Sequence, residues 1–142
     1  MQHTTTEQWL KRAWKIEDRA RREKEKITEL RSTLYEVRGV SYDNVRVQTS
    51  GGDTMGDKVA RLADLERRYV DDVVDSELMK CETLTKIHTL DDDPEESLLY
   101  LRYIRRLNYY EIAEEMDRSL RYLHRLHNEA IAALSEKLET AV

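Results

Sequence analysis

The sequence predicts an all-α protein, with a long antiparallel helical hairpin (coiled coil) over residues 1–92 and a smaller helical domain over residues 93–142. The first observation is composition: 37% of the residues are charged, 39% are hydrophobic, and there are four glycines, one proline and no phenylalanine. The second is periodicity, because apolar residues recur at helical spacing. Together these features are typical of an elongated helical protein rather than a compact β or α/β domain.

The first predicted helix begins at a capping box, in which Thr4 stands three residues before Glu7. It runs to about Val37, since nothing breaks the helical pattern before Gly39. A helix of ~30 residues is ~45 Å long, which is too long for a small globule, so we expect a partner helix. Its apolar residues form a heptad seam that only Glu23 interrupts: Ala13, Ile16, Ala20, Ile27, Leu30, Leu34 and Val37.

A glycine-containing loop over residues 39–56 leads into the second long helix, which starts at Thr54 or Gly56 and runs to about Leu90. Two long helices joined by a loop predict the antiparallel hairpin, and pairing between two copies of the chain, as a homodimer, is the alternative. The single cysteine, Cys81, is expected to be a small buried hydrophobe, and alone it cannot form an internal disulfide. The apolar stripe of this helix has an imperfect phase: Val59, Leu62, Leu65, Tyr69, Val73, Cys81, Leu84 and Ile87.

Three further helices are predicted in residues 93–142. Asp93 is expected to cap the first of them, with Pro94 as its first helical residue and Glu96 completing the capping box. A short helix follows over residues 109–116. After a break that ends at Ser119, which is suited to an N-cap, a long helix runs from Leu120 to about residue 139. The expected apolar positions are Leu98, Leu101, Ile104, Ile112, Ala113, Met116, Leu123, Leu126, Ala130, Leu134 and Leu138.

The start of the last helix carries an unusual charge pattern. Residues 118–128 hold three arginines, two histidines and no carboxylate, in a chain whose net charge is −5. Two short helices joined by a tight turn, with basic residues opening the second, describe a helix-turn-helix whose second helix enters the DNA major groove. Arginine suits this task because its planar fork can bind guanine or phosphate. We assign to base edges Leu120, Arg121, His124 and Arg125, and to the DNA backbone Tyr109, Arg118 and Tyr122.

Two resemblances point the same way. Residues 107–134, which include EIAEEM at 111–116 and SLRYLHRLHNEAIAAL at 119–134, resemble region 4 of bacterial sigma factors. Residues 41–66, SYDNVRVQTSGGDTMGDKVARLADLE, followed by this motif, are similar to the RinA/ArpU-type sigma-like regulators of phages of Gram-positive bacteria. The resemblance implies a phage late-gene transcriptional activator that binds double-stranded DNA. One departure is that Asp117 and Arg118 stand where the sigma motif usually has a turn glycine and an aliphatic residue.

Other functions find little support in the sequence. It has no glycine-rich phosphate loop, no nucleophile elbow and no Cys/His spacing for zinc, so we expect no enzyme activity, cofactor or metal site. No membrane-spanning stretch and no signal-peptide pattern is found, which predicts a cytoplasmic protein. Residues 39–94 hold seven basic and thirteen acidic side chains and are not expected to face DNA. The alternatives are a protein-interaction module that docks on RNA polymerase or another regulator, and a DNA-packaging protein like a terminase small subunit.

Overall fold

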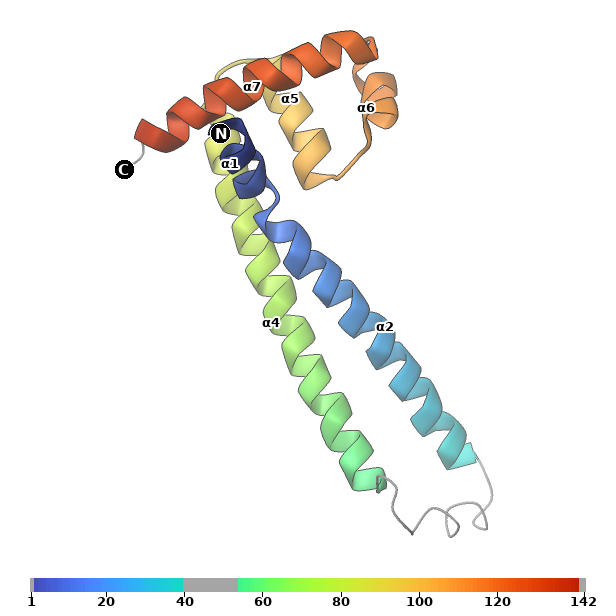
Figure 1. Cartoon of the computed structure of the whole chain (residues 1–142). Helices are drawn as coiled ribbons and strands as arrows, with labels where there is room; N and C mark the ends of the chain where they lie inside the picture. The colour runs from blue at the N-terminus through green and yellow to red at the C-terminus, as the bar shows by residue number, and fades with distance from the viewer. Residues whose placement is uncertain (1, 40–53, 141–142) are drawn as a thin grey trace. The chain divides into compact units, whose positions relative to one another are not determined.

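The computed structural model describes residues 2–39 and 54–140, and every regular element in those ranges is a helix (Figure 1). This confirms the all-α prediction. Within the described residues, no helix is long and apolar enough to cross a membrane. In chain order the elements are α1 (Gln2–Leu10), α2 (Arg12–Gly39), α4 (Met55–His88), α5 (Asp93–Leu99), the π-helix η1 (Tyr100–Ile104), α6 (Tyr109–Met116) and α7 (Leu120–Thr140).

The chain divides into two compact units, residues 1–13 with 77–142 and residues 14–76. The first, which we call the C-terminal unit, contains α1, the end of α4, and all of α5, η1, α6 and α7. The second, which we call the paired-helix unit, contains most of α2 and of α4. The predicted boundary at residue 93 therefore falls inside the C-terminal unit, which also includes the N-terminal helix.

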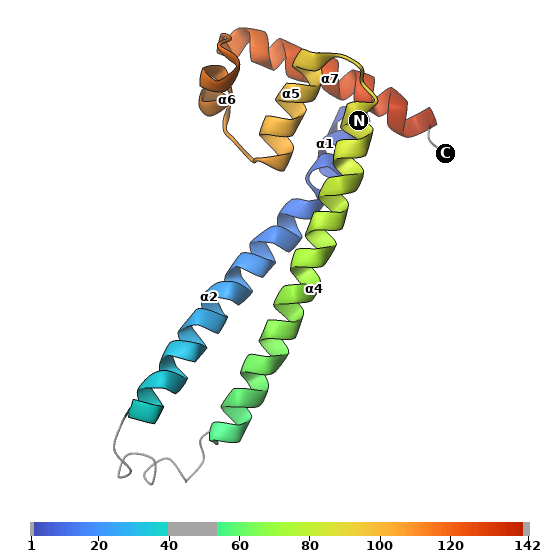
Figure 2. The ribbon, with the colours of Figure 1, turned by 180° about the vertical axis from the view of Figure 1, so that it is seen from behind.

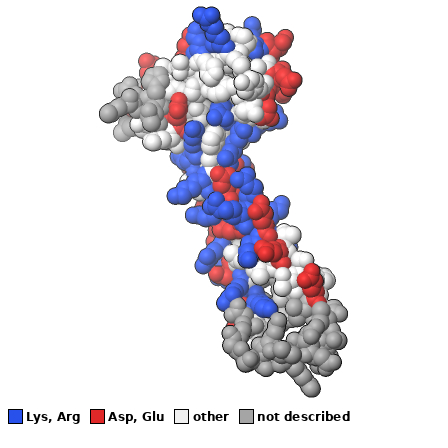
Figure 3. Space-filling model, turned by 45° about the vertical axis from the view of Figure 1, so that its right-hand side comes forward, with Lys and Arg blue, Asp and Glu red and all other residues white. Residues whose placement is uncertain are grey.

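In the paired-helix unit, α2 and α4 lie side by side and run in opposite directions (Figures 1 and 2). Arg19 pairs with Asp72 at 2.7 Å, and Arg31, further along α2, pairs with Glu66, earlier on α4, at 2.6 Å. Along the two helices, basic and acidic side chains are interleaved (Figure 3). Most of the predicted connecting loop, residues 40–53, lies outside the described residues.

The start of α4 is set by a reciprocal cap between Thr54 and Asp57. The hydroxyl of Thr54 accepts a hydrogen bond from the backbone N–H of Asp57 at 3.1 Å, and the Asp57 carboxylate accepts one from the Thr54 N–H at 3.2 Å. Both pairs satisfy donors that a helix N-terminus otherwise leaves free. Of the two proposed starting residues, Thr54 is therefore the cap.

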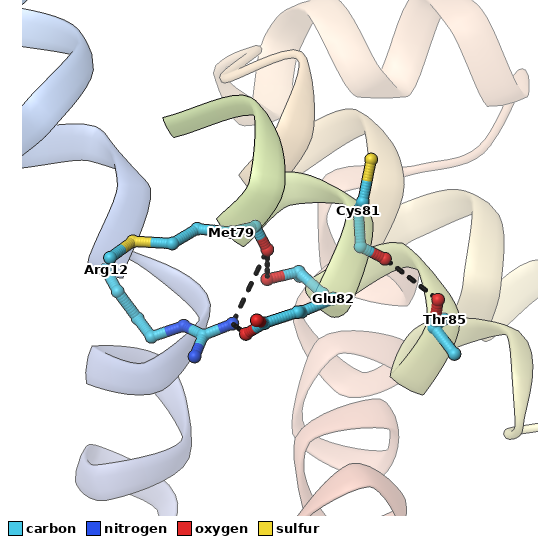
Figure 4. Close-up of polar contacts among 6 residues, drawn as sticks. Arg12, Met79, Cys81, Glu82 and Thr85 are labelled. Atoms are coloured by element: carbon cyan, nitrogen blue, oxygen red, sulfur yellow. Dashed lines mark hydrogen bonds and ion pairs between the residues drawn. The ribbon is translucent and has the colours of Figure 1, made fainter. Parts of the chain in front are cut away.

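The apolar stripe predicted for α4 is wrong in part, because it combines residues from two faces of the helix. Val59, Cys81 and Leu84 are exposed, whereas Thr83 and Ile87 are buried. Figure 4 shows the Cys81 side chain directed away from Arg12 of α2. The buried face of α4 is partly polar, and a pattern built only from apolar residues could not identify it. The polar residues buried on α4 are Asp72, Ser76 and Thr83.

The N-terminal helix also differs from the prediction. It begins at Gln2, so Thr4 lies inside α1 and does not cap it, and the helix is interrupted at Lys11. The interruption lets α1 pack against α7, which buries Leu10 to 2% exposure. Arg12, the first residue of α2, then donates hydrogen bonds to the Met79 carbonyl at 3.4 Å and to the Glu82 carboxylate at 3.1 Å (Figure 4). Tertiary packing thus overrides a helical pattern that is locally unbroken.

Glu23, the one polar residue in the α2 seam, is half-buried beside the buried carboxylate of Asp72 in the paired-helix unit. Arg19 donates two hydrogen bonds to Asp72, at 2.8 and 2.7 Å, and Glu23 is hydrogen-bonded to the same carboxylate. The hydrogen bond from Arg19 lowers the pKa of Asp72, whereas burial raises the pKa of Glu23. Oε2 of Glu23 is buried and has no hydrogen-bond partner among the described residues. Ionised Glu23 is therefore unfavourable here.

We expect Glu23→Gln to raise the thermal unfolding midpoint at pH 7. The pKa of Glu23 is raised above 4.5 in the folded chain. Just above pH 4.5, the folded chain therefore keeps the Glu23 proton, whereas the unfolded chain has released it. Stability should therefore fall as pH rises from 4.5 through the folded pKa, and glutamine should remove that fall. Asp72 has the opposite pH dependence, because its pKa is lowered in the folded chain. The stability that ionised Asp72 contributes is lost as pH drops below 3.8. Thermal melts across this range compare Glu23→Gln with Glu25→Gln, an exposed control on the same helix. An equal effect of both variants would contradict the assignment.

Candidate nucleic-acid interface

The first helix of the candidate interface begins one residue earlier than predicted. The N-cap of α5 is Asp92, whose carboxylate accepts from the Glu95 N–H at 3.2 Å, so Asp93 is already helical. Pro94 then occupies one of the first helical positions, where a missing N–H has no cost. The acidic residues here form the cap and first turn of α5: Asp92, Asp93, Glu95 and Glu96. The described residues contain no group of three or more His, Cys, Asp or Glu side chains that could hold a metal ion.

A wider turn connects α5 to α6. The chain continues from α5 into η1, and the Leu107 N–H donates to the Leu101 carbonyl at 3.0 Å to close the end of that helix. Arg106 adopts a left-handed conformation there, with φ of 58°. The Arg102 guanidinium donates to the Leu107 carbonyl at 3.1 Å, and Arg105 pairs with Glu115 at 3.7 Å. The contacts with Leu107 and Glu115 give Arg102 and Arg105 structural roles.

The short helix α6 has the bounds that the sequence predicted. The side chain of Asn108 accepts from the Glu111 N–H at 2.9 Å, and the Glu111 carboxylate accepts from the Asn108 N–H at 3.0 Å. This reciprocal capping box fixes the helix start. Glu111 is thus held in a cap.

The turn between α6 and α7 is built by three consecutive residues. Asp117 ends α6 in the left-handed conformation, with φ of 54° and ψ of 51°. The Arg118 N–H donates to the Ala113 carbonyl at 3.2 Å, and the Ser119 hydroxyl accepts from the Tyr122 N–H at 3.2 Å. The predicted N-cap role of Ser119 is confirmed. An aspartate therefore forms the left-handed turn that glycine forms more readily.

We expect Asp117→Gly to stabilise the C-terminal unit by about 0.5–1 kcal/mol, because glycine removes the cost of a left-handed side-chain-bearing residue. Urea unfolding measures the change. The matched control is Glu114→Gly, which places glycine at an exposed position inside α6 and should destabilise the unit by about 1 kcal/mol. A loss of stability for Asp117→Gly as large as the control's would refute the turn geometry.

An apolar core packs the first turns of α7 against the helices before it. Its side chains come from α5, η1, α6 and α7, so the first turns of α7 are fixed relative to α6. The buried members are Leu98, Leu101, Ile112, Leu123 and Leu126; packed against them are Leu107, Tyr109, Ala113, Met116 and Tyr122. The helical periodicity predicted most of this set.

The four residues predicted to read bases lie together on the first two turns of α7. Arg121, His124 and Arg125 are exposed, and Leu120 is half-buried. Arg121 and Arg125 are four residues apart and share one side of the helix. In the described part of the chain, neither they nor Arg118 form an ion pair with a carboxylate. Their charges are therefore available to an anionic partner.

The two tyrosines predicted to contact phosphates contribute their rings to the packing of the unit. The ring of Tyr109 lies against that of His124, with centroids 4.4 Å apart and ring planes tilted by 34°, and the Arg102 guanidinium lies 5.3 Å from the Tyr109 centroid. Burial raises the pKa of the Tyr109 phenol. The ring of Tyr122 is half-buried against the core beneath the guanidiniums of Arg118 and Arg125, at 5.1 and 5.8 Å.

His127, the second histidine of the acid-free stretch, does not belong to the exposed surface. It is 7% exposed, and its Nε2 lies 2.7 Å from the hydroxyl of Tyr103, which is also buried. Burial lowers the pKa of His127 and raises that of Tyr103, so both are neutral near pH 7. The spacing of His127 from Leu123 and Ile131, four residues each way, is the signal that places it on the buried stripe.

Comparison with models of known protein families, with curated proteins and with solved structures finds no match to this chain.

Proposed function

We propose that the protein is a sequence-specific DNA-binding transcription regulator, with α6 and α7 acting as a helix-turn-helix. One observation carries this proposal: exposed Arg121, His124 and Arg125 open a helix that is held on a packed core, and no carboxylate within the described residues neutralises the two arginines. A solvent-exposed helix of an ordinary bundle has no need of an acid-free first turn. The resemblance of this segment to sigma-factor region 4 supports the same role.

In this proposal the first turns of α7 enter the major groove. Arg121 and Arg125 donate to guanine O6 and N7, His124 adds a further polar contact, and Leu120 touches a thymine methyl. Arg118 binds a phosphate beside the N-terminus of α7, where the helix dipole also favours an anion. The phosphate contact positions the domain, and the helix face determines sequence preference.

The finer identity that we propose is a phage-type late-gene activator. It rests on the resemblance of residues 41–66 and of the C-terminal motif to RinA/ArpU-type regulators. The paired helices α2 and α4, as an antiparallel coiled-coil hairpin, would supply oligomerisation or a contact to RNA polymerase. Exposed valines on α4, at positions 59, 70 and 74, are 51%, 56% and 50% exposed and suit such a protein contact.

A fluorescence-anisotropy titration tests the proposal. Labelled duplexes from upstream of neighbouring genes are titrated with the whole protein, with scrambled duplex as competitor and at several salt concentrations. The regulator predicts binding that survives the competitor and weakens as salt rises. Equal affinity for scrambled and natural duplexes would reject sequence-specific regulation and favour a protein-docking module. A ring of about eight to ten subunits in solution would instead favour a packaging role.

A further inference from the structure

We propose that the Tyr122 ring is a platform that orients Arg118 and Arg125 toward DNA, and that its hydroxyl makes no required phosphate contact. The observation is that both guanidiniums lie over one ring, with Cζ 5.1 and 5.8 Å from its centroid. Tyr122 is then a positioning residue. This inference rests on the proposed function and adds how the binding surface is held in place.

The ring is itself fixed by its surroundings. Tyr122 is half-buried and packs against the core formed by Leu98, Leu101, Ile112, Leu123 and Leu126. Its N–H donates to the Ser119 cap, so its backbone position is set by the first turn of α7. A side chain anchored in this way can restrict two long, flexible arginines that would otherwise sample many rotamers in solvent.

An aromatic ring suits this task better than a carboxylate. An aspartate or glutamate would orient an arginine equally well, but it would also cancel the positive charge that a phosphate or guanine must meet. The π face of a tyrosine attracts a guanidinium while leaving its N–H donors and its net charge available. No described carboxylate forms an ion pair with Arg118 or Arg125, which agrees with this arrangement.

The arrangement uses neighbours on both sides of Tyr122 in the chain. Arg125 lies three residues after it on α7, at a spacing where helical side chains meet. Arg118 lies four residues before it, in the turn that Asp117 forms. One ring therefore connects the residue assigned to a phosphate with a residue assigned to a base edge. Loss of the ring should weaken both contacts at once.

The first test needs no DNA. In the free protein, the ring current of Tyr122 should shift the side-chain proton resonances of Arg118 and Arg125 away from their random-coil positions. Tyr122→Phe should keep these shifts, and Tyr122→Leu should abolish them. Random-coil resonances for both arginines in the wild-type protein would overturn the platform, whatever the protein binds.

The second test measures DNA affinity of the same variants. We expect Tyr122→Phe to bind like the wild type and Tyr122→Leu to bind about tenfold more weakly, because two ring contacts are lost. Arg125→Ala should cost less in the Tyr122→Leu background than in the wild type, since the two act together. Tyr35→Leu, at a 76% exposed position on α2, is the matched control. Thermal melts show whether Tyr122→Leu remains folded at the binding temperature.

The outcomes separate the two proposals. Equal weakening by Tyr122→Phe and Tyr122→Leu would overturn the platform, because the hydroxyl would then be the required group. Wild-type affinity in a folded Tyr122→Leu variant would also overturn it. Shifted arginine resonances in a protein that binds no DNA would instead reject the proposed function, while the ring would still be shown to orient the arginines.

Discussion

Leu123→Ala is expected to destabilise the C-terminal unit by about 2–5 kcal/mol. Leu123 is 0% exposed and belongs to the core that joins α7 to α5 and α6. Its truncation removes buried apolar area and leaves a cavity that the surrounding side chains fill only in part. Urea unfolding monitored by helical circular dichroism measures the loss, and DNA binding should fall with it at temperatures where the unit is partly unfolded.

The matched control for this prediction is Leu78→Ala. Leu78 lies on α4 and is 59% exposed, so the same truncation there should change stability by less than about 0.5 kcal/mol. If the two variants lost equal stability, Leu123 would not occupy the core position described here.

Arg121→Gln is expected to weaken specific DNA binding by about 1–3 kcal/mol, or roughly 5- to 150-fold, if the guanidinium makes a bidentate contact to guanine. Arg121 is exposed on the first turn of α7, and glutamine keeps its polarity while removing the fork and the charge. The expected signature is lost discrimination at one base pair, which separates a reading residue from one that binds phosphate.

Arg22→Gln supplies the control for charge alone. Arg22 is exposed on α2. Arg22→Gln therefore changes the net charge as Arg121→Gln does, but leaves α7 unchanged. We expect this variant to keep wild-type base preference. Unchanged affinity and preference in Arg121→Gln would show that this arginine is a solvated surface residue.

The sequence predicted the elements whose ends are set by local chemistry. Helix α6 has the predicted bounds because Asn108 and Glu111 cap its start and Asp117 ends it. Helix α7 starts as predicted because the Ser119 hydroxyl accepts from the backbone. The buried stripe of α7 follows from a 3.6-residue period that few polar residues interrupt.

Features that depend on distant parts of the chain were not predictable in this way. The break at Lys11 arises because α1 packs on α7, more than a hundred residues later in the sequence. The exposure of Cys81 reflects a polar buried face on α4 that includes Asp72, whose carboxylate is bound by Arg19 of α2. The ring contacts of Tyr122 likewise depend on side-chain geometry that periodicity does not encode.

Selection from a library of random DNA duplexes tests the central claim most directly, because the library contains candidate operators of every sequence. The whole protein is used to capture duplexes over several rounds, and the bound pool is sequenced for the wild type and for Arg121→Gln. We predict that the wild type enriches a defined motif, and that Arg121→Gln enriches the same motif with one position relaxed. Failure of the folded wild-type protein to enrich any motif would contradict the claim that the first turns of α7 read DNA sequence.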